Sequence, residues 1–524
     1  MVLADFTYFD VYPQIAHLFS CTAHCMKILT VDQIRALDQA TIQHEPIAPI
    51  NLMERAASAF TDWYVSRFSP ETPIKMFCGL GNNGGDGAAI ARLLLERAYP
   101  VEVFVVRYAP RESDDFTHNH RRLKLLTTPI YIEGPHSIPA IPHNEVVIDA
   151  LLGSGLSRPA DGLIKQVIAA INRSPAITVA VDLASGLFAD RPNGPDDVII
   201  EPDYTVTFQL PKLALVQPKN GKFVGDWYAV DIRLNQRFID SARTNLYYTS
   251  PAEARLLLRK RERFSNKGTF GHALLLAGSY GKIGAAVLAA RACLRSGVGL
   301  LTVQTPGCGY GIMQTAVPEA MIRPDQNEHV LTGYSDLGGL MPGEFSAVGM
   351  GPGIGKSRET LSMLRELLPS LRKPAVIDAD ALNILAENRD MLGMLPENTI
   401  LTPHPKEFER LTQRWENDFD KLEILQDFAR RYRLVVVLKG AHTAIATPGG
   451  DVHFNATGNP GLSTGGTGDV LTGVLTALLA QGYDSEEAAV LGVYAHGLAG
   501  DRVAADRGQA GMTATDVVEA LRWE

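Results

Sequence analysis

The chain has 524 residues, of which 46% are hydrophobic and 20% are charged, a balance typical of globular α/β proteins. Its formal net charge of -9 gives no electrostatic attraction for nucleic acid, and its apolar stretches are too short and too interrupted by glycine to span a bilayer as a helix. We therefore expect neither a nucleic-acid nor a membrane partner, and at about 150 residues per domain the length fits two large domains.

The N-terminal residues 1–25 are predicted to be an extension of the first domain. They do not form a secretory signal, because they lack its basic start and apolar core. Cys21, His24 and Cys25 lie close together there, but a metal site needs a fourth ligand and none is near. The five cysteines of the chain have no regular spacing and leave one unpaired in any full pairing. This usage favours a reducing cytoplasm.

A helical pattern begins after residue 26. Thr30 and Gln33 predict a capping box that opens a helix through residues 34–42, and residues 51–68 form a second amphipathic helix. Residues 74–80 then read as a strand, the first of a series in which strands and helices alternate. Such alternation predicts an α/β fold with a parallel sheet.

Three strand ends in this first half carry small and polar residues. Residues 74–80 are followed by GNNGGDG, predicted as a loop over 81–87, then by a helix and a strand over 101–106. The segments 146–155 and 177–187 each end in an aspartate followed by small residues. Because ligands bind beyond the carboxyl ends of parallel strands, we expect these three ends to share one pocket.

The side chains at these ends point to a phosphate and cation site. Oxygen-bearing side chains gather there: Asn82, Asn83, Asp86, Asp149 and Ser185. No lysine follows the glycine-rich segment, so it is not a P-loop, and the oxygens suit a hard cation better than a thiolate-seeking metal. The alternative is that each residue merely caps a turn. Asp182 is the acid/base candidate.

The alternating pattern stops after residues 224–232, and the polar segment that follows predicts a domain boundary. We place the first domain at residues 26–235, a linker at 236–247 and the second domain at 248–524. Strands and helices alternate again in the second domain. The two halves share this alternation but no motif, so they are not repeats.

The most informative motif of the second half is NPGLSTGGTGD at residues 459–469, which runs directly into a helical pattern. Backbone N–H groups near Gly465, Gly466 and Gly468 can converge on a phosphate at the helix N-terminus. Asp469 is then placed where it could deprotonate a substrate hydroxyl. A structural cap would need far less glycine, so the motif indicates an enzyme.

For the other candidate site residues in this half, the sequence leaves a functional and a structural interpretation. GMGPGIGKS at residues 349–357 is not a Walker A motif, because position 350 is Met where that motif needs Gly. Asp378 and Asp380 follow a strand and could orient a metal-bound phosphate, although Asp380 could equally cap a helix. His404, between two prolines, could contact substrate or lie in a rigid turn.

Residues from about 245 to 524 resemble the ADP- or ATP-dependent NAD(P)H-hydrate dehydratases of the ribokinase-like superfamily. The resemblance covers most of the domain and follows the family's order through GMGPG, VIDADALN, LTPHPKEF, KGAHT and NPGLSTGGTGDVLTG. Residues 26 to about 235 resemble the NAD(P)H-hydrate epimerases through GNNGGDG, VIDALLGSGLSRP and VDLASG. The fold implied is a Rossmann-like parallel-sheet sandwich followed by a ribokinase-like α/β sandwich.

The resemblance implies repair of hydrated nicotinamide cofactor. The epimerase half would interconvert the R and S hydrates of NADH and NADPH, and the dehydratase half would restore the S form while ADP is converted to AMP and phosphate. K⁺ and Mg²⁺ are the implied cofactors, ADP is the implied co-substrate, and a homo-oligomer is the implied assembly.

The site residues implied by the resemblance form four groups. In the epimerase half, the dinucleotide would be held by Asn82, Asn83, Gly84, Gly85, Asp86, Gly153, Ser154, Gly155, Leu156, Ser157, Arg158 and Pro159, with Asp182 beside the reacting ring. K⁺ would be coordinated by Asn83, Asp149 and Ser185. In the dehydratase half, the adenine nucleotide would be bound by Lys439, Gly440, Ala441, His442, Thr443 and Gly468. The hydrate would face Ala286, Gly353, His404 and the catalytic Asp469.

Two positions depart from the family pattern, Ala184 where Pro is usual and Lys406 where Gly is usual, and neither removes a reacting group. Two other functions stay open. A small-molecule kinase with an N-terminal nucleotide-binding domain shares the GTGD element and would yield a stable phosphorylated product. A non-enzymatic binding module would bind nucleotides without turnover, but the intact Asp182 disfavours it.

Overall fold

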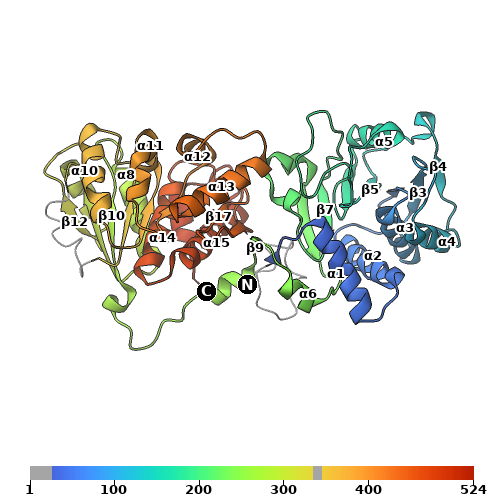
Figure 1. The fold of residues 1–524 in the computed structure, drawn as a ribbon, viewed down its shortest axis with the longest axis horizontal. Coiled ribbons are helices and arrows are strands. Elements are labelled where there is room, and N and C mark those ends of the chain that lie inside the picture. Colours follow the sequence, from blue (N-terminus) through green and yellow to red (C-terminus); the bar gives the residue numbers. More distant parts are fainter. Residues whose placement is uncertain (1–25, 334–344, 524) are drawn as a thin grey trace, which may run out of the picture. The chain divides into compact units, whose positions relative to one another are not determined.

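The structure is a computed structural model that describes residues 26–333 and 345–523. The predicted N-terminal extension, with Cys21, His24 and Cys25, lies outside the described residues. The chain divides into two compact units, which within the described residues are 26–244 (unit 1) and 245–523 (unit 2) (Figure 1). The predicted two-domain α/β fold is confirmed. No helix of the described residues is long and apolar enough to cross a membrane.

Unit 1 is built on a parallel sheet with the strand order β4-β3-β2-β5-β6-β7-β8. Its strands are β2 (Ile74–Cys78), β3 (Val101–Val106), β4 (Ile130–Ile132), β5 (Val146–Ala150), β6 (Ile177–Val181), β7 (Tyr204–Phe208) and β8 (Asp226–Val230), and β1 (Met26–Lys27) precedes them. Met76 of β2 packs on one face of the sheet, whereas its neighbour Phe77 packs on the other. This alternation follows from the pleat and makes a three-layer sandwich.

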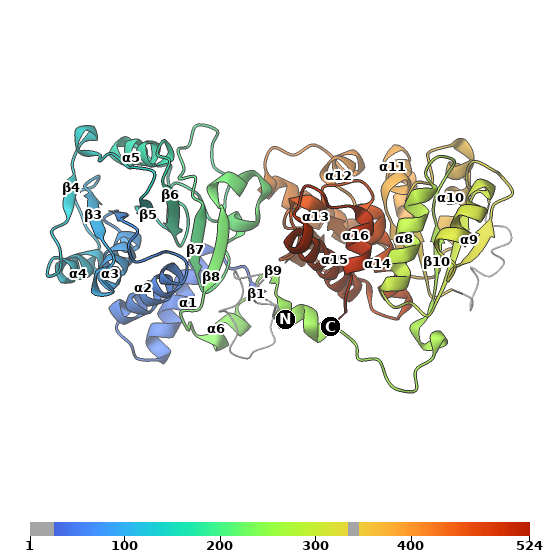
Figure 2. The same cartoon turned by 180° about the vertical axis from the view of Figure 1, so that it is seen from behind.

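Helices cover both faces of this sheet. They are α1 (Val31–His44), α2 (Pro49–Val65), α3 (Asn82–Glu96), α4 (Asp114–Leu123), α5 (Gly162–Asn172) and α6 (Gln236–Ser241). Helices α2, α3 and α4 share a core with one face, and α5 shares a core with the other (Figure 2). The capping box predicted at Thr30 and Gln33 is confirmed at the start of α1.

Two segments of unit 1 differ from their predicted form. The GNNGGDG segment, predicted as a loop over residues 81–87, instead forms the first turns of α3, with Gly81 as its N-cap. The predicted linker, residues 236–247, contains α6, whose Ile239 packs with Leu37 and Leu52 in a small core of unit 1. Phe238 and Ala242 of the same segment also pack against this core.

Unit 2 has a sheet with the order β9-β18-β17-β16-β15-β14-β13-β10-β11-β12. Its strands are β9 (Leu246–Thr249), β10 (His272–Leu276), β11 (Leu300–Thr305), β12 (Met321–Pro324), β13 (Ala347–Met350), β14 (Ala375–Ile377), β15 (Ile400–Leu401), β16 (Val435–Leu438), β17 (Ala444–Ala446) and β18 (Val452–Asn455). Strands β16, β17 and β18 pair antiparallel, and the other neighbours pair parallel. The hairpin between β16 and β17 is closed by KGAHT.

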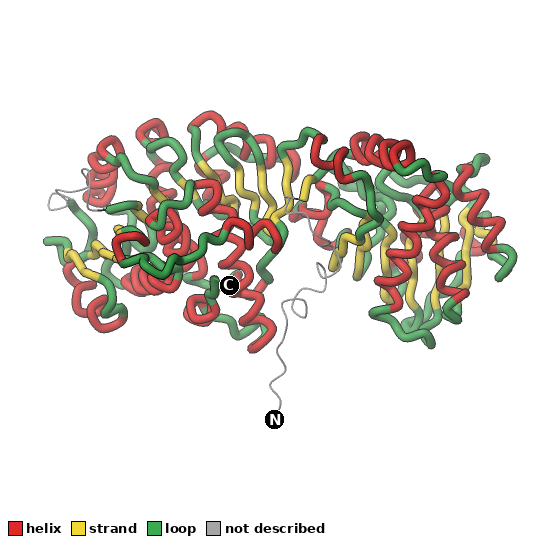
Figure 3. The backbone as a smooth tube through the Cα atoms, turned by 90° about the horizontal axis from the view of Figure 1, so that it is seen from below, coloured by secondary structure: helices red, strands yellow, loops and turns green. Residues whose placement is uncertain are grey.

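The helices of unit 2 are α7 (Pro251–Leu257), α8 (Ile283–Arg295), α9 (Tyr310–Ala316), α10 (Arg358–Ser370), α11 (Ala379–Glu387), α12 (Pro405–Leu411), α13 (Asp418–Tyr432), α14 (Thr467–Ala480), α15 (Ser485–Arg507) and α16 (Ala514–Ala520). Helices α8, α14, α15 and α16 share one large core with the sheet. Figure 3 shows the strands of each unit flanked by helices.

In each sheet there is one strand from which the chain first builds the sheet toward one side and later toward the other side. In unit 1 this strand is β2, which pairs with β3 on one side and β5 on the other. In unit 2 it is β10, which pairs with β11 and β13. The loops that leave such a strand diverge, so the crevice beyond its carboxyl end is where a parallel α/β sheet binds ligands.

Candidate active sites

The sheet of unit 1 brings the three predicted strand ends together. Strand β5 pairs with β2 and with β6, so the segments that follow these strands lie beside one another. The start of α3, the loop after Ala150 and the turn at Asp182 therefore border one region at the carboxyl edge. Sequence alone placed them 30 or more residues apart.

The glycines of GNNGGDG are needed for packing. A Cβ on Gly84 would lie 2.0 Å from the carbonyl oxygen of Gly79, and one on Gly87 would lie 2.5 Å from Cβ of Ala150. Only glycine lets the first turn of α3 approach β2 and β5 this closely. The approach aims the N-terminus of a helix, with its free N–H groups, at the strand ends, as an anion site requires.

The residues predicted to bind K⁺ form one hydrogen-bonded cluster. Ser185 Oγ donates to Asp149 Oδ1 over 2.6 Å, and the Ser185 N–H donates to Asp149 Oδ2 over 2.8 Å. Asn83 Nδ2 donates to the Leu152 carbonyl over 2.9 Å, and Ser185 Oγ lies 3.0 Å from the same oxygen. Burial raises the pKa of Asp149 to about 6, while the bonds from Ser185 and Leu151 lower it.

Asp182 lies in a strained turn and is paired with a buried lysine. Its φ of 66° is in the left-handed region, which is uncommon outside glycine and typical of functional sites. Lys212 Nζ donates to Asp182 Oδ1 over 2.5 Å and to Thr207 Oγ1 over 2.7 Å. Burial acts to raise the pKa of Asp182, but Lys212 and the hydrogen bonds of Ser154 and Phe208 lower it below its ordinary value.

Lys212 and Asp38 are members of this site that sequence reasoning missed. Asp38 lies on α1, and burial raises its pKa to about 6, with Lys212 and Asp182 acting on it in opposite directions. Burial and the charges of Asp182, Asp115 and Asp38 raise the pKa of Asp86 well above its ordinary value. A lysine inside the apolar segment LPKLAL was the only available signal for Lys212.

The predicted dinucleotide loop, residues 153–159, is mostly exposed. Arg191 Nη2 donates to the Ser157 carbonyl over 2.5 Å, and Arg35 Nη2 lies 3.1 Å from where a Cβ on Gly155 would be. The loop is thus bordered by guanidinium groups, which suit the phosphates of a dinucleotide.

In unit 2, Asp469 lies in the first turn of α14, as predicted. Gly466 is the N-cap with a φ of 93°, a conformation that favours glycine. A Cβ on Gly468 would lie 3.4 Å from Lys439 Nζ and 3.6 Å from Asp378 Oδ2, so this turn borders both charged groups. Burial raises the pKa of Asp469 to about 6; Asp378 and Asp380 also raise it, and Lys439 lowers it.

Asp378 and Asp380 connect several loops of this site. Asp378 is almost fully buried, and it accepts hydrogen bonds from Lys439 Nζ at 3.0 Å and Thr472 Oγ1 at 2.8 Å. Asp380 accepts from the Gly355 N–H at 2.9 Å and from Lys282 Nζ at 3.1 Å. Asp380 therefore ties α11 to two other loops, and capping, the alternative weighed from sequence, is not what its side chain does.

His404 takes the role of a turn residue in this structure. It is the N-cap of α12, and its Nδ1 accepts from the N–H groups of Lys406 at 3.2 Å and Glu407 at 3.4 Å. Burial, followed by the charges of Lys439 and Arg410, lowers its pKa. The ring is thus held in one orientation at the start of α12.

The remaining predicted residues of unit 2 are placed as follows. In the KGAHT hairpin, Thr443 Oγ1 accepts from the Gly440 N–H at 3.3 Å, and His442 Nδ1 lies 2.9 Å from the Asn455 carbonyl. Gly353 has a φ of 63° and packs close to the start of α8. Ala286 of α8 is fully buried beneath the Gly278 turn, so it supports the site from the core.

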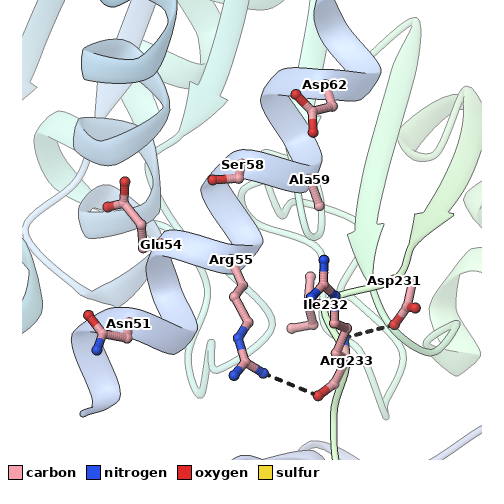
Figure 4. Close-up of a pocket in the computed structure, with 9 residues that line it drawn as sticks. All are labelled: Asn51, Glu54, Arg55, Ser58, Ala59, Asp62, Asp231, Ile232 and Arg233. Carbon is pink, nitrogen blue, oxygen red and sulfur yellow. Dashed lines mark hydrogen bonds between the residues drawn. The ribbon is translucent and has the colours of Figure 1, made fainter. Parts of the chain in front are cut away.

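A separate hollow of about 450 Å³ lies on unit 1 between α2 and the segment after β8 (Figure 4). It is lined by Asn51, Glu54, Arg55, Ser58, Ala59, Asp62, Asp231, Ile232 and Arg233. Side chains of both charges face it, and Arg55 Nη1 donates to the Arg233 carbonyl. None of the predicted site residues lines it, so it is distinct from the site around Asp182.

Comparison with known proteins finds relatives of each unit and of the whole chain. The family model for NAD(P)H-hydrate dehydratase matches residues 273–522, and the model for the YjeF-related protein N-terminus matches residues 49–214. The chain is 38% identical to a bifunctional NAD(P)H-hydrate repair enzyme Nnr of Moorella thermoacetica, over 95% of this chain and 96% of that protein. It is 33% identical to the Escherichia coli enzyme of the same name, over 94% of this chain and 92% of that protein.

Solved structures give a further likeness. An ADP/ATP-dependent NAD(P)H-hydrate dehydratase from Bacillus subtilis, crystallised with ATP and Mg²⁺, is 31% identical and has a TM-score of 0.47. The match covers 54% of this chain and 100% of that chain.

Proposed function

Because the chain belongs to the family of bifunctional NAD(P)H-hydrate repair enzymes, we propose that unit 1 epimerises the hydrates and unit 2 dehydrates the S form to NADH or NADPH. The observation that carries this proposal is similarity over 94% to 95% of the chain to enzymes of this name. The two aspartates that we propose as catalytic lie one in each unit, Asp182 after β6 and Asp469 in the first turn of α14. The kinase alternative is disfavoured because it leaves the site around Asp182 without a role.

In unit 2, Asp469 would accept the proton of the C6 hydroxyl as the hydroxyl oxygen attacks the terminal phosphorus of ADP, the bond from that phosphorus to the bridging oxygen breaks and AMP leaves. Its raised pKa brings it near the operating pH, which is what a general base needs. The N–H groups at the start of α14 would stabilise charge on the transferred group. Elimination then follows, because phosphate leaves far better than hydroxide. This order explains a kinase fold in a lyase.

The nucleotide would be held by residues 439–443 and Gly468, with Lys439 as the positive charge nearest the phosphates. ADP is our proposed co-substrate, because the fused arrangement is shared with the bacterial relatives. Bound Mg²⁺ would share the phosphate charge. The described residues hold no cluster of three acidic, His or Cys side chains arranged to bind a metal ion.

In unit 1, the C6 hydroxyl would leave and return beside Asp182, which inverts the carbon. K⁺ fits the Asn83, Asp149 and Ser185 cluster, because Asp149 is a fully buried carboxylate. The influences on its pKa are burial and hydrogen bonds from Ser185 and Leu151, and none of them is a positive charge. A bound cation would supply the missing positive charge there and so fix the loop after β5.

The test is recovery of NADH absorbance at 340 nm from a mixture of R and S hydrates with Mg²⁺, K⁺ and either ADP or ATP. The wild-type chain is expected to restore all of the NADH. Asp469→Asn should abolish recovery, and Asp182→Asn should stop it at the S fraction. Nucleotide consumption with a stable phosphorylated product and no NADH would instead establish the kinase. Comparison of NADH recovery with ADP and with ATP identifies the co-substrate.

A further inference from the structure

Lys212 is among the most buried charged side chains of the described residues, with 1% of its surface exposed. It follows Pro211, in a segment where Leu213 and Ala214 are also buried. Removing an ammonium group from water is costly, so a buried lysine needs nearby partners that hold its charge. Its Nζ has three: Asp182 Oδ1 at 2.5 Å, Thr207 Oγ1 at 2.7 Å and the Phe208 carbonyl at 3.2 Å.

These contacts fix one oxygen of Asp182. Oδ1 accepts from Lys212 Nζ, from Thr207 Oγ1 at 3.2 Å and from the Phe208 N–H at 3.3 Å. Ser154 also acts on this carboxylate through a hydrogen bond, but the three donors from Lys212, Thr207 and Phe208 all meet Oδ1, so Oδ2 is the oxygen through which Asp182 would act on a ligand. The strained backbone at Asp182 is held by its own N–H, which donates to the Val206 carbonyl over 2.8 Å.

Carboxyl groups face this pair from several elements. Asp38 comes from α1 and Asp86 from α3, Asp115 of α4 acts on Asp86, and Asp190 lies within electrostatic reach of Lys212. Lys212 is the positive charge that acts on Asp182 among these groups. Burial and repulsion would protonate Asp182 if that charge were absent.

We infer that Lys212 is a positioning residue of the epimerase site, which keeps Asp182 ionised and presents its Oδ2 to the reacting ring. This inference rests on the proposed epimerase function of unit 1. Lys212 therefore acts through Asp182 and need not touch the hydrate. It separates one carboxylate whose pKa is lowered from neighbours whose pKa values are raised, a division found where acid and base work are done side by side.

A purely structural role would be a buried ion pair that anchors the segment after β7. Such a pair would affect the free energy of unfolding and the amount of active enzyme, but it would not move the pH at which activity is gained. The pH profile of epimerisation therefore separates the two roles, and thermal unfolding of the full chain measures the structural one.

The experiment compares wild type, Lys212→Met and Lys212→Arg for epimerisation of pure R hydrate over pH 5 to 9, with dehydration of S hydrate measured on the same preparations. Wild type, whose Asp182 pKa is lowered, should show no acidic limb in this range, whereas Lys212→Met should bring a limb of kcat/KM into it, a shift of more than about one pH unit, since burial and the neighbouring carboxylates then raise the Asp182 pKa. Lys212→Arg should return the limb toward wild type. Dehydration by unit 2 should be unchanged.

Lys222→Met is the matched control, because Lys222 is exposed on unit 1, pairs across 2.9 Å with the exposed Glu201 and lies over the ring of its neighbour Phe223, away from Asp182. It should keep the wild-type profile. If Lys212→Met does not fold, Lys212→Gln, which keeps a donor but not the charge, takes its place. An unshifted limb in a folded variant would overturn the inference, as would loss of activity at every pH. Absence of epimerisation in wild type would instead refute the function of unit 1.

Discussion

Asp469 and Asp182 are chemically identical side chains with opposite electrostatic surroundings. Burial and the neighbouring Asp378 raise the pKa of Asp469 to about 6, with Lys439 opposing them. Burial acts in the same direction on Asp182, but the direct bond to Lys212 outweighs it and the pKa falls below the ordinary value. The distance to the lysine decides the outcome, since Lys439 bonds to Asp378 and not to Asp469.

This contrast predicts different pH dependences for the two activities of one chain. Asp469 must be ionised to act as a base, so dehydration should be lost as pH falls through about 6. Epimerisation, which depends on Asp182, should persist to lower pH because the pKa of Asp182 is lowered. Initial rates of both reactions at limiting substrate, measured on the same preparation, test this. Coincident acidic limbs would contradict it.

At the scale of elements, each site depends on a helix that begins close to other backbone. The first turn of α3 lies against the β2 strand end, and Gly473 of α14 packs so closely on α8 that a Cβ there would lie 2.1 Å from the Ala289 carbonyl. Glycine at these positions sets where the helix N-terminus lies. Close packing of backbone is therefore what positions the proposed anion sites.

Gly84→Ala is expected to destabilise unit 1, since its Cβ would lie 2.0 Å from the Gly79 carbonyl oxygen. Overpacking of this kind costs about 1 to 3 kcal/mol or more. Gly81→Ala is the control, because nothing lies within 4 Å of a Cβ there. The half-life of epimerase activity at a fixed elevated temperature should fall for the first variant only, with the half-life of dehydratase activity as internal reference. Equal half-lives for both variants would refute the packing argument.

Helix α15 supports the glycine-rich turn of unit 2 through one carboxylate. Asp501 accepts from the Gly458 N–H and from Asn459 Nδ2, each at 2.7 Å, at the start of NPGLSTGGTGD. Asp501→Ala leaves both donors without this acceptor, at a cost of about 1 to 3 kcal/mol. We expect a raised KM for nucleotide in dehydration. The exposed Asp506→Ala on the same helix should leave KM unchanged, and equal KM values for both variants would show that Asp501 does not support the turn.

At the scale of the whole molecule, each unit has its own sheet, its own core and its own candidate site. All the groups that surround Asp182 come from unit 1, and those around Asp469 come from unit 2. The two reactions are thus expected to be chemically independent and joined by the S hydrate, the product of one site and the substrate of the other.

This independence predicts that two inactive halves complement each other. An equimolar mixture of Asp182→Asn and Asp469→Asn chains should restore all the NADH from mixed hydrates, because the first supplies dehydration and the second supplies epimerisation. Absorbance at 340 nm follows the recovery, with each variant alone as the reference. Recovery that stops at the S fraction in the mixture would mean that the hydrate does not pass between chains.

Local features of the sequence determined much of this protein. The alternation of strands and helices predicted the α/β fold in two domains, Thr30 and Gln33 predicted a helix cap, and the glycine-rich motif placed Asp469 at a helix start. Each signal lies within a few residues along the chain, where propensity and hydrogen bonding act directly. The family resemblance rested on motifs of the same local kind.

Only the tertiary structure decided which distant groups meet. Lys212 bonds to Asp182 across 30 positions in sequence, and Asp38 joins them from another helix. The turn of GNNGGDG became helix because α3 packs on two strands, and Asp380 bonds to Gly355 instead of capping. Such contacts follow from strand order and close packing, which no short stretch of sequence specifies, and they shift the pKa of each proposed catalytic carboxylate.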